Sequence, residues 1–179
     1  MGGCIKLTIE VLQYPTEKDW QLCKECTLGT IHKSNGKNPN LNWKKKILAS
    51  EHSPIRVLNF TFRIHDLPYW VAMHLVRHHV GMTPFVSTQR TDRTGIDRNE
   101  LKQGEFVMLI MNMNAQALIN ICHKRLCKQA SKETREVIQA IVDEVLKTNP
   151  EFNEVLVPNC VYRGGKCTEF FSCRKGTTK

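Results

Sequence analysis

The chain has 179 residues, of which 41% are hydrophobic and 24% charged, and its formal net charge is +9 at pH 7. This mixture is ordinary for a globular protein and excludes an intrinsically disordered chain. The longest apolar run, at residues 106–111, is far shorter than the ~20 residues of a membrane-spanning helix, so we expect no membrane segment. The positive charge favours anionic partners such as phosphates, nucleotides or nucleic acid, without choosing among them.

The first part of the chain predicts two strands and two helices. Alternating residues predict a strand over 6–11, and Thr16 is placed to cap the helix that follows. Residues 34–40 have the composition of a loop, and we expect a short basic helix over 43–48. The clearest strand covers residues 58–65, where large apolar side chains alternate with polar ones.

Next, a helix is expected to begin at Asp66, which is a good N-cap residue. Pro68 would then lie inside the first helical turn, where its missing N–H does no harm. We expect this helix to run to about His79. From residue 81 to 98 the chain is polar and rich in turn-forming residues.

The last part of the domain predicts a buried strand over 106–111 and two helices, over 114–128 and 131–147. The second helix carries a continuous apolar stripe, which is typical of a helix packed on a core. No repeat or linker divides the chain. We therefore expect one α+β domain with an antiparallel or mixed sheet packed with helices, folded over residues 1–173 and followed by a disordered basic tail at 174–179.

The eight cysteines do not indicate a secreted disulfide framework. The N-terminus runs directly into a strand pattern rather than a charged and then apolar leader, so we expect a cytoplasmic protein with reduced thiols. Cys122 and Cys127 are expected in a helix and in the core. The others are either simple reduced thiols or ligands of a tetrahedral zinc site that ties down the tail. The candidate zinc ligands are Cys160, Cys167 and Cys173 in the tail with Cys23 and Cys26 of the first helix.

A cluster of basic residues carries the strongest chemical signal. On a helix, His74, Arg77 and His78 would share one face. The structural explanation is that cations are favoured at a helix C-terminus. The functional one is that several donors converge on a phosphate, which Arg can bind with two hydrogen bonds.

The spacing of this cluster favours the functional explanation. Arg77, His78 and His79, followed after seven residues by Ser87, resemble the Arg-His-Arg-x7-Ser signature of the flavin-dependent thymidylate synthases. Further blocks resemble that family in the same order, and the resemblance covers about residues 43–173. These blocks are 51–56 with 59–62, 114–120 with 124–126, 130–135, and 158–169.

The resemblance implies a thymidylate synthase-complementing-protein-like fold and a homotetramer that binds FAD between subunits. Such enzymes methylate dUMP to dTMP, with methylenetetrahydrofolate as the carbon donor and NADPH as the reductant. The resemblance assigns the nucleotide and its phosphate to His74, Arg77, Ser87, Arg90 and Arg125, with Ser87 and Arg125 closest to the chemistry. It assigns the flavin to Ser53, His78, His79, Asn114 and Asn120.

The chain also departs from the family pattern at several positions. His79 replaces an Arg, Glu51 a His, Phe85 a carboxylate and Gln116 an Arg, while Arg90 lies one place late. A long helical segment of the family, with an arginine for the nucleotide phosphate, is reduced here to residues 91–113. Arg90, Arg93 and Arg98 are the candidates to replace that arginine.

Two alternative functions remain open at this point. The first is a pyrimidine deoxynucleotide hydroxymethylase on the same fold that uses folate and little or no flavin, which the altered flavin positions motivate. The second is a non-enzymatic basic module that binds nucleic acid, which the +9 charge and the cysteines motivate. The ordered blocks make nucleic acid the less favoured partner, and they favour a deoxyuridine nucleotide.

Overall fold

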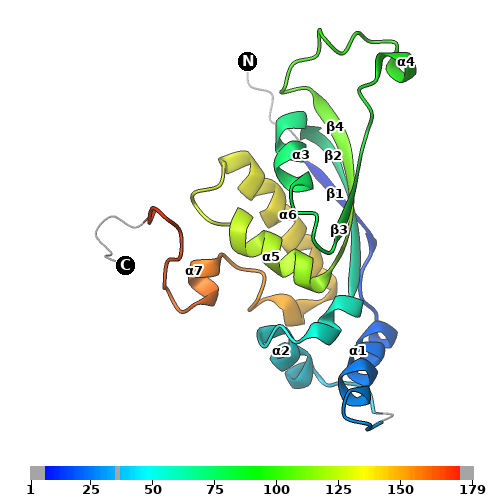
Figure 1. Ribbon diagram of the computed structural model, residues 1–179, viewed down its shortest axis with the longest axis vertical. Helices are drawn as coiled ribbons and strands as arrows, with labels where there is room; N and C mark the ends of the chain where they lie inside the picture. The colour runs from blue at the N-terminus through cyan, green and yellow to red at the C-terminus, as the bar shows by residue number, and fades with distance from the viewer. Residues whose placement is uncertain (1–6, 35–36, 174–179) are drawn as a thin grey trace.

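A four-stranded antiparallel sheet forms the centre of the molecule (Figure 1). The computed structural model describes residues 7–34 and 37–173. In the sheet the strands lie in the order β1-β2-β4-β3. They are β1 (Thr8–Gln13), β2 (Asn59–Pro68), β3 (Met82–Val86) and β4 (Phe106–Asn114).

Helices cover one face and one end of this sheet. Figure 1 shows α3, α5 and α6 on the same side of the sheet, α1 and α2 at one end of the molecule, and α4 on an extended arm at the other end. The helices are α1 (Glu17–Gly29), α2 (Leu41–Ala49), the 3-10 helix η1 (Ser53–Val57), α3 (Tyr69–Val76), α4 (Thr91–Thr94), α5 (Ala115–Arg125), α6 (Lys132–Thr148), the 3-10 helix η2 (Pro150–Phe152) and α7 (Asn159–Tyr162). The predicted α+β class is confirmed.

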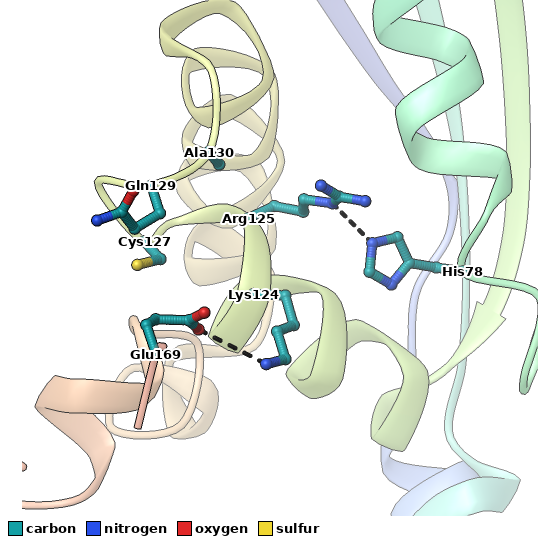
Figure 2. A pocket seen from close by; sticks show the side chains of 7 residues that line it. All are labelled: His78, Lys124, Arg125, Cys127, Gln129, Ala130 and Glu169. Carbon is teal, nitrogen blue, oxygen red and sulfur yellow. Dashed lines mark hydrogen bonds and ion pairs between the residues drawn. The ribbon is translucent and has the colours of Figure 1, made fainter. Parts of the chain in front are cut away.

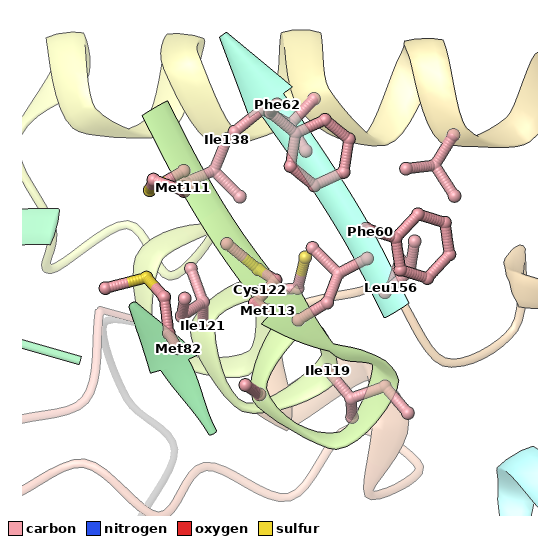
Figure 3. Close-up of a cluster of buried hydrophobic side chains, with 14 of the residues drawn as sticks. Phe60, Phe62, Met82, Met111, Met113, Ile119, Ile121, Cys122, Ile138 and Leu156 are labelled. Atoms are coloured by element: carbon pink, nitrogen blue, oxygen red, sulfur yellow. The ribbon is translucent and has the colours of Figure 1, made fainter. Parts of the chain in front are cut away.

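The core lies between the sheet and these helices because the two central strands alternate. Phe60 and Phe62 of β2 pair with Met113 and Met111 of β4, and all four side chains are buried on the same face. Figure 3 shows them facing Ile138 of α6, one member of the predicted apolar stripe. The period of two in the strands and the apolar stripe of the helix therefore meet in one hydrophobic layer.

The opposite face of the sheet carries polar side chains that bridge neighbouring strands. The amide of Asn112 donates to the hydroxyl of Thr61 (2.8 Å), and this hydroxyl donates to the side chain of Gln13 (3.0 Å). Arg63 forms an ion pair with Glu10 of β1 (2.9 Å). An antiparallel sheet with one buried and one polar face has this pattern.

The helix predicted from Asp66 to His79 is wrong at both ends. Strand β2 continues to Pro68 through a register shift between Ile64 and Leu67, and Asp66 takes a positive φ of 53° there instead of capping a helix. Helix α3 begins at Tyr69 and ends at Val76. Arg77, His78 and His79 therefore follow the helix and do not share a helical face with His74.

The turn-rich region at residues 81–98 contains a strand that composition did not reveal. β3 is an edge strand with Pro84 in its middle, a position that an edge strand tolerates. β4 is longer than predicted, and only alternate residues of it are buried.

Other predicted elements agree with the structure within a few residues. Thr16 caps α1, where its N–H donates to the carboxylate of Asp19 (2.7 Å), and α6 matches the expected helix. β1 begins and ends two residues later than expected. Residue 6 and the tail predicted at 174–179 lie outside the described residues.

Candidate functional site

Helix α5 presents cationic side chains at its C-terminal end. Asn114 caps its N-terminus, where the side-chain oxygen accepts a hydrogen bond from the N–H of Ala117 (3.0 Å). The last turn carries Lys124 and Arg125. Positive charge is favoured there by the unpaired carbonyl groups of the helix end, so the sequence places these two cations without strain.

Arg125 reaches from this turn to the end of α3. Its Nε donates to Nε2 of His78 (2.7 Å), as Figure 2 shows, and its Nη2 donates to the carbonyl oxygen of His74 (3.0 Å). The basic residues therefore do converge, but through contacts between two helices distant in sequence rather than along one helical face.

These contacts fix the protonation state of His78. A guanidinium group only donates hydrogen bonds, so Nε2 of His78 accepts and the neutral ring carries its proton on Nδ1. Burial, together with the positive charges of Arg125, Arg77 and His79, lowers the pKa of His78 to about 4. Burial and Arg77 also lower the pKa of Arg125, which stays a cation at neutral pH. At pH 7 the site thus pairs a charged guanidinium with a neutral imidazole.

A cavity of about 380 Å³ opens beside this pair (Figure 2). Its volume lies in the range of small-molecule sites, and its lining is rich in hydrogen-bond donors. Glu169 of the C-terminal segment closes one side, 3.5 Å from the ammonium group of Lys124. The lining residues are His78, Lys124, Arg125, Cys127, Gln129, Ala130 and Glu169.

A second, smaller cavity of about 190 Å³ shares His78 with the first. Three residues predicted as ligand contacts line it besides His78, namely Arg77, His79 and Asn120. Nδ1 of His79 lies 3.2 Å from the carbonyl oxygen of Arg77, which holds the ring next to its own backbone. His78 therefore separates two cavities that are both lined by residues of the predicted site.

The side chain of His74 points toward α6. Its Nδ1 lies 3.4 Å from the hydroxyl of the buried Thr134, and its ring packs edge-on against Trp70 with the centroids 5.5 Å apart. His74 lines neither cavity, and its observed link to the site is the carbonyl oxygen that Arg125 binds.

Four other predicted residues also line neither cavity of this chain. The hydroxyl of Ser87 accepts from the N–H of Met108 (3.1 Å) and extends the β3–β4 pairing. Arg90 forms an ion pair with Asp92 (2.7 Å) on the arm, and Ser53 begins η1. The fourth residue is Asn114, whose side chain caps α5 and lines neither cavity.

A short hydrogen-bonded chain connects two of the altered positions, Glu51 and Gln116, to Asn120, which the resemblance assigns to the flavin. Nε2 of Gln116 donates to the carboxylate of Glu51 and, at 3.4 Å, to Oδ1 of Asn120. Glu51 itself has a positive φ of 47°. Two of the residues that depart from the family pattern thus contact each other and engage Asn120 at the edge of the smaller cavity.

The tail cysteines do not join Cys23 and Cys26 in one site, because the small cavity lined by Cys160, Cys167 and Cys173 includes neither residue of α1. Cys23 is buried within α1 beside Cys26, where burial raises the pKa of its thiol to about 12. Cys127 lies in the turn after α5, not in a helix as predicted. In the part of the chain that the structure describes, no three Cys, His, Asp or Glu side chains are already disposed around one point as metal ligands.

Sequence reasoning assigned to the site only His78 and Arg125 among the lining residues of the larger cavity, and the polar side chains it missed include Lys124, Gln129 and Glu169. Lys124 precedes Arg125 in the same basic turn, which was a usable signal. Gln129 and Glu169 had no comparable signal, because the C-terminal segment reaches α5 only in the folded chain.

Within residues 7–34 and 37–173, no helix is long and apolar enough to cross a membrane.

A family model described as thymidylate synthase complementing protein matches residues 98–151. The matched residues include Arg125 and Asn120, whereas the Arg77-His78-His79 motif lies before them. A search of curated proteins found no match to the sequence.

Two solved structures share the fold over nearly their whole length. A UMP/dUMP methylase, PolB from Streptomyces cacaoi, bound with 5-Br dUMP, superposes with a TM-score of 0.65 at 15% identity, covering 85% of this chain and 97% of that one. Thymidylate synthase X from Helicobacter pylori, with FAD and dUMP, gives a TM-score of 0.65 at 13% identity, covering 87% and 99%. The family model thus matches part of the chain, and the two superpositions show a shared fold.

Proposed function

We propose that this chain, as the flavin-dependent thymidylate synthase family member that its fold and family match support, converts dUMP to dTMP. The proposed carbon donor is methylenetetrahydrofolate, and the proposed reductant is NADPH acting through FAD. The observation that carries the proposal is the pair of Arg125 and neutral His78 at the wall of a cavity of about 380 Å³.

Arg125 is suited to act on the pyrimidine ring. Its bonds to His78 and His74 use two of the five guanidinium N–H donors, and others are left for a ligand in the cavity. A cation beside the ring stabilises the enolate-like negative charge on the pyrimidine that makes C5 nucleophilic toward the incoming carbon. Because His78 and the His74 carbonyl already hold the guanidinium, little reorganisation is needed when the substrate binds.

The phosphate of dUMP needs further positive charge, which the same region supplies. Lys124 extends into the larger cavity, and Arg77 lines the smaller one. Ser87 and Arg90 line neither cavity of one chain. We therefore assign them, with Ser53, to sites completed by a neighbouring subunit of a homotetramer.

The chemistry of the smaller cavity fits part of FAD. Arg77, His79 and Asn120 supply a cation and hydrogen-bond donors, as the flavin ring and pyrophosphate require. FAD, when bound, would carry reducing equivalents from NADPH. In this proposal His78 orients the flavin side of the site, and Asn114 holds the start of α5 beside it.

A visible spectrum tests this proposal. The protein is mixed with FAD, desalted, and scanned with and without dUMP. We expect a retained flavin band that shifts on dUMP addition in the wild type and in Arg63→Lys, whose position lines neither cavity, but not in Arg125→Lys. Folded protein that retains no flavin, or a shift that survives in Arg125→Lys, would contradict the proposed site.

One observation favours a second function, a pyrimidine deoxynucleotide hydroxymethylase with little or no flavin. The Glu51-Gln116-Asn120 chain engages the side-chain oxygen of Asn120, which the family resemblance assigns to flavin. Product mass separates the two functions, because a hydroxymethyl product carries one more oxygen than a methyl product. Formation of plain dTMP would eliminate this second candidate.

A further inference from the structure

The C-terminal segment after α7 is placed without help from the hydrophobic core. Tyr162 is the last described residue that packs against the core. Beyond it the chain forms turns and bends, and Phe170 and Phe171 are 79% and 74% exposed. A segment with so little apolar burial needs another source of stability to hold one conformation.

Polar contacts at exposed positions tie this segment to the body. The amide of Asn159 donates to the hydroxyl of Thr168 (2.7 Å), and Gln129 donates to the carbonyl oxygen of Phe171 (3.1 Å). Exposed contacts of this kind contribute about 1 kcal/mol each at most. The ion pair of Glu169 with Lys124 (3.5 Å) is also partly exposed and adds a similarly small contribution.

Four cysteines meet at the place where this segment joins the body. Cys127 comes from the turn after α5, Cys160 from α7, and Cys167 and Cys173 from the turns beyond. All four line one small cavity, and all four are free thiols. The fold brings Cys127 from the end of α5 to the three cysteines of the tail, and four thiols that line one cavity are a ligand set of the kind that metals take.

The size and chemistry of the cavity identify that ligand. Its volume is about 10 Å³, room for about one water-sized particle, which suits a single metal ion and not a cluster of several atoms. Four thiolates are the ligand set that Zn²⁺ takes in tetrahedral structural sites, with Zn–S bonds of about 2.3 Å. Lys128 follows Cys127 and Lys166 precedes Cys167, and these cations offset the negative charge of a four-thiolate site.

We propose that Cys127, Cys160, Cys167 and Cys173 bind one structural Zn²⁺ that fixes the C-terminal segment against the end of α5. Each thiol loses its proton to solvent when its sulfur coordinates the metal. The sulfurs are not yet disposed as ligands, so binding draws them inward. Cys167 and Cys173 lie outside helices and strands, and this movement therefore breaks no regular secondary structure.

The site would act on the larger cavity through two shared residues. Cys127 and Glu169 line both the thiol cavity and the cavity beside Arg125. A metal bound at the cluster would hold Glu169 next to Lys124 and so keep that wall closed. Zinc here is structural and distinct from the proposed chemistry at C5.

Metal analysis tests the zinc proposal and uses neither FAD nor dUMP. Failure of the zinc proposal is therefore distinguishable from failure of the proposed function. The reduced protein is incubated with Zn²⁺, desalted and assayed for zinc. We expect about one equivalent per chain, and Co²⁺ in its place should give thiolate-to-cobalt charge-transfer absorption. Cys127→Ser and Cys173→Ser should lose the metal. Cys26→Ser on α1 should retain it as the matched control.

Cys173 is exposed, so the Cys173→Ser variant keeps the test valid even if Cys127→Ser fails to fold. Circular dichroism confirms that this variant is folded. Folded wild-type protein that retains no zinc would overturn the proposal. Zinc that is retained by both Cys127→Ser and Cys173→Ser would also overturn it. So would a metal-free protein whose mass shows the four thiols oxidised in pairs.

Discussion

The two ends of helix α5 carry residues of the same family-like block, but the residues at each end make different contacts. At the N-terminal end the Asn114 side chain accepts from the helix backbone, and Gly81 packs against it with a φ of +74°. At the C-terminal end, Lys124 and Arg125 extend from the last turn into the larger cavity. The comparison teaches that a motif residue can cap the helix at one end and line the proposed ligand cavity at the other.

The largest effect is expected at the ligand end. Arg125→Gln removes the charge that stabilises the developing negative charge on the pyrimidine, and we expect kcat for dTMP formation to fall roughly 10²- to 10³-fold. Arg63→Gln on the polar face of the sheet is the control for loss of an arginine. A kcat within a few-fold of wild type in Arg125→Gln would show that this end of α5 does not face the reacting ring.

The next largest effect is expected where Gly81 meets the cap. An alanine Cβ there would lie 2.8 Å from Nδ2 of Asn114, and the positive φ adds a further penalty of about 1–2 kcal/mol. We therefore expect Gly81→Ala to lower the free energy of unfolding, measured in urea, by at least that amount. Gly29→Ala, at an open position with ordinary φ, should leave it nearly unchanged.

A double-mutant cycle sharpens this second prediction. In an Asn114→Ala background the atoms that the new Cβ would contact are gone, so Gly81→Ala should cost less than in the wild type. Equal costs in both backgrounds would mean that backbone conformation alone requires the glycine.

Loss of the cap itself is expected to have a smaller effect. Asn114→Ala removes the acceptor for the Ala117 N–H and should lower the free energy of unfolding by about 1 kcal/mol. Asn114→Ser retains a capping oxygen and should recover most of that loss. If the serine variant is as unstable as the alanine variant, the side chain has another structural partner.

A separate effect is a pH dependence at His78. The pKa of its side chain is about 4 in the folded chain and about 6.5 when unfolded, so between these values the unfolded chain binds more protons. The free energy of unfolding should therefore decrease as the pH falls from about 6.5 to about 4. His78→Gln should decrease less over that window. Identical pH profiles for the two proteins would contradict the buried, neutral His78.

Periodicity predicted the parts of the fold that local patterns control. Helix α6 and the central strands have strong repeats of apolar residues, and the structure confirms them. The sequence did not reveal β3, because a short edge strand that contains Pro84 has the composition of a turn. Asp66 and Pro68 imitate a helix start, whereas pairing with β4 keeps them in the strand. Tertiary pairing overrides local preference at such positions.

The sequence indicated some of the residues that line the two cavities, but not how they assemble. The motif spacing indicated His78 and Arg125, and the structure joins them directly. The motif spacing could not indicate that Glu169 lines the cavity or that Cys127 lies beside the tail cysteines. Those contacts depend on where the C-terminal segment lies in the fold. Whether Ser53, Ser87 and Arg90 act in the site stays a prediction.

The antiparallel pairing of β2 with β4 also has a consequence for synthesis on the ribosome. β2 ends at Pro68, but its central partner is complete only at Asn114, and α6 follows later still. Until then Phe60 and Phe62 lack the residues that bury them, and one edge of β2 lacks its hydrogen-bond partner. Uncovered strands of this kind aggregate readily. The nascent chain is therefore most in need of a chaperone between the emergence of β2 and that of α6.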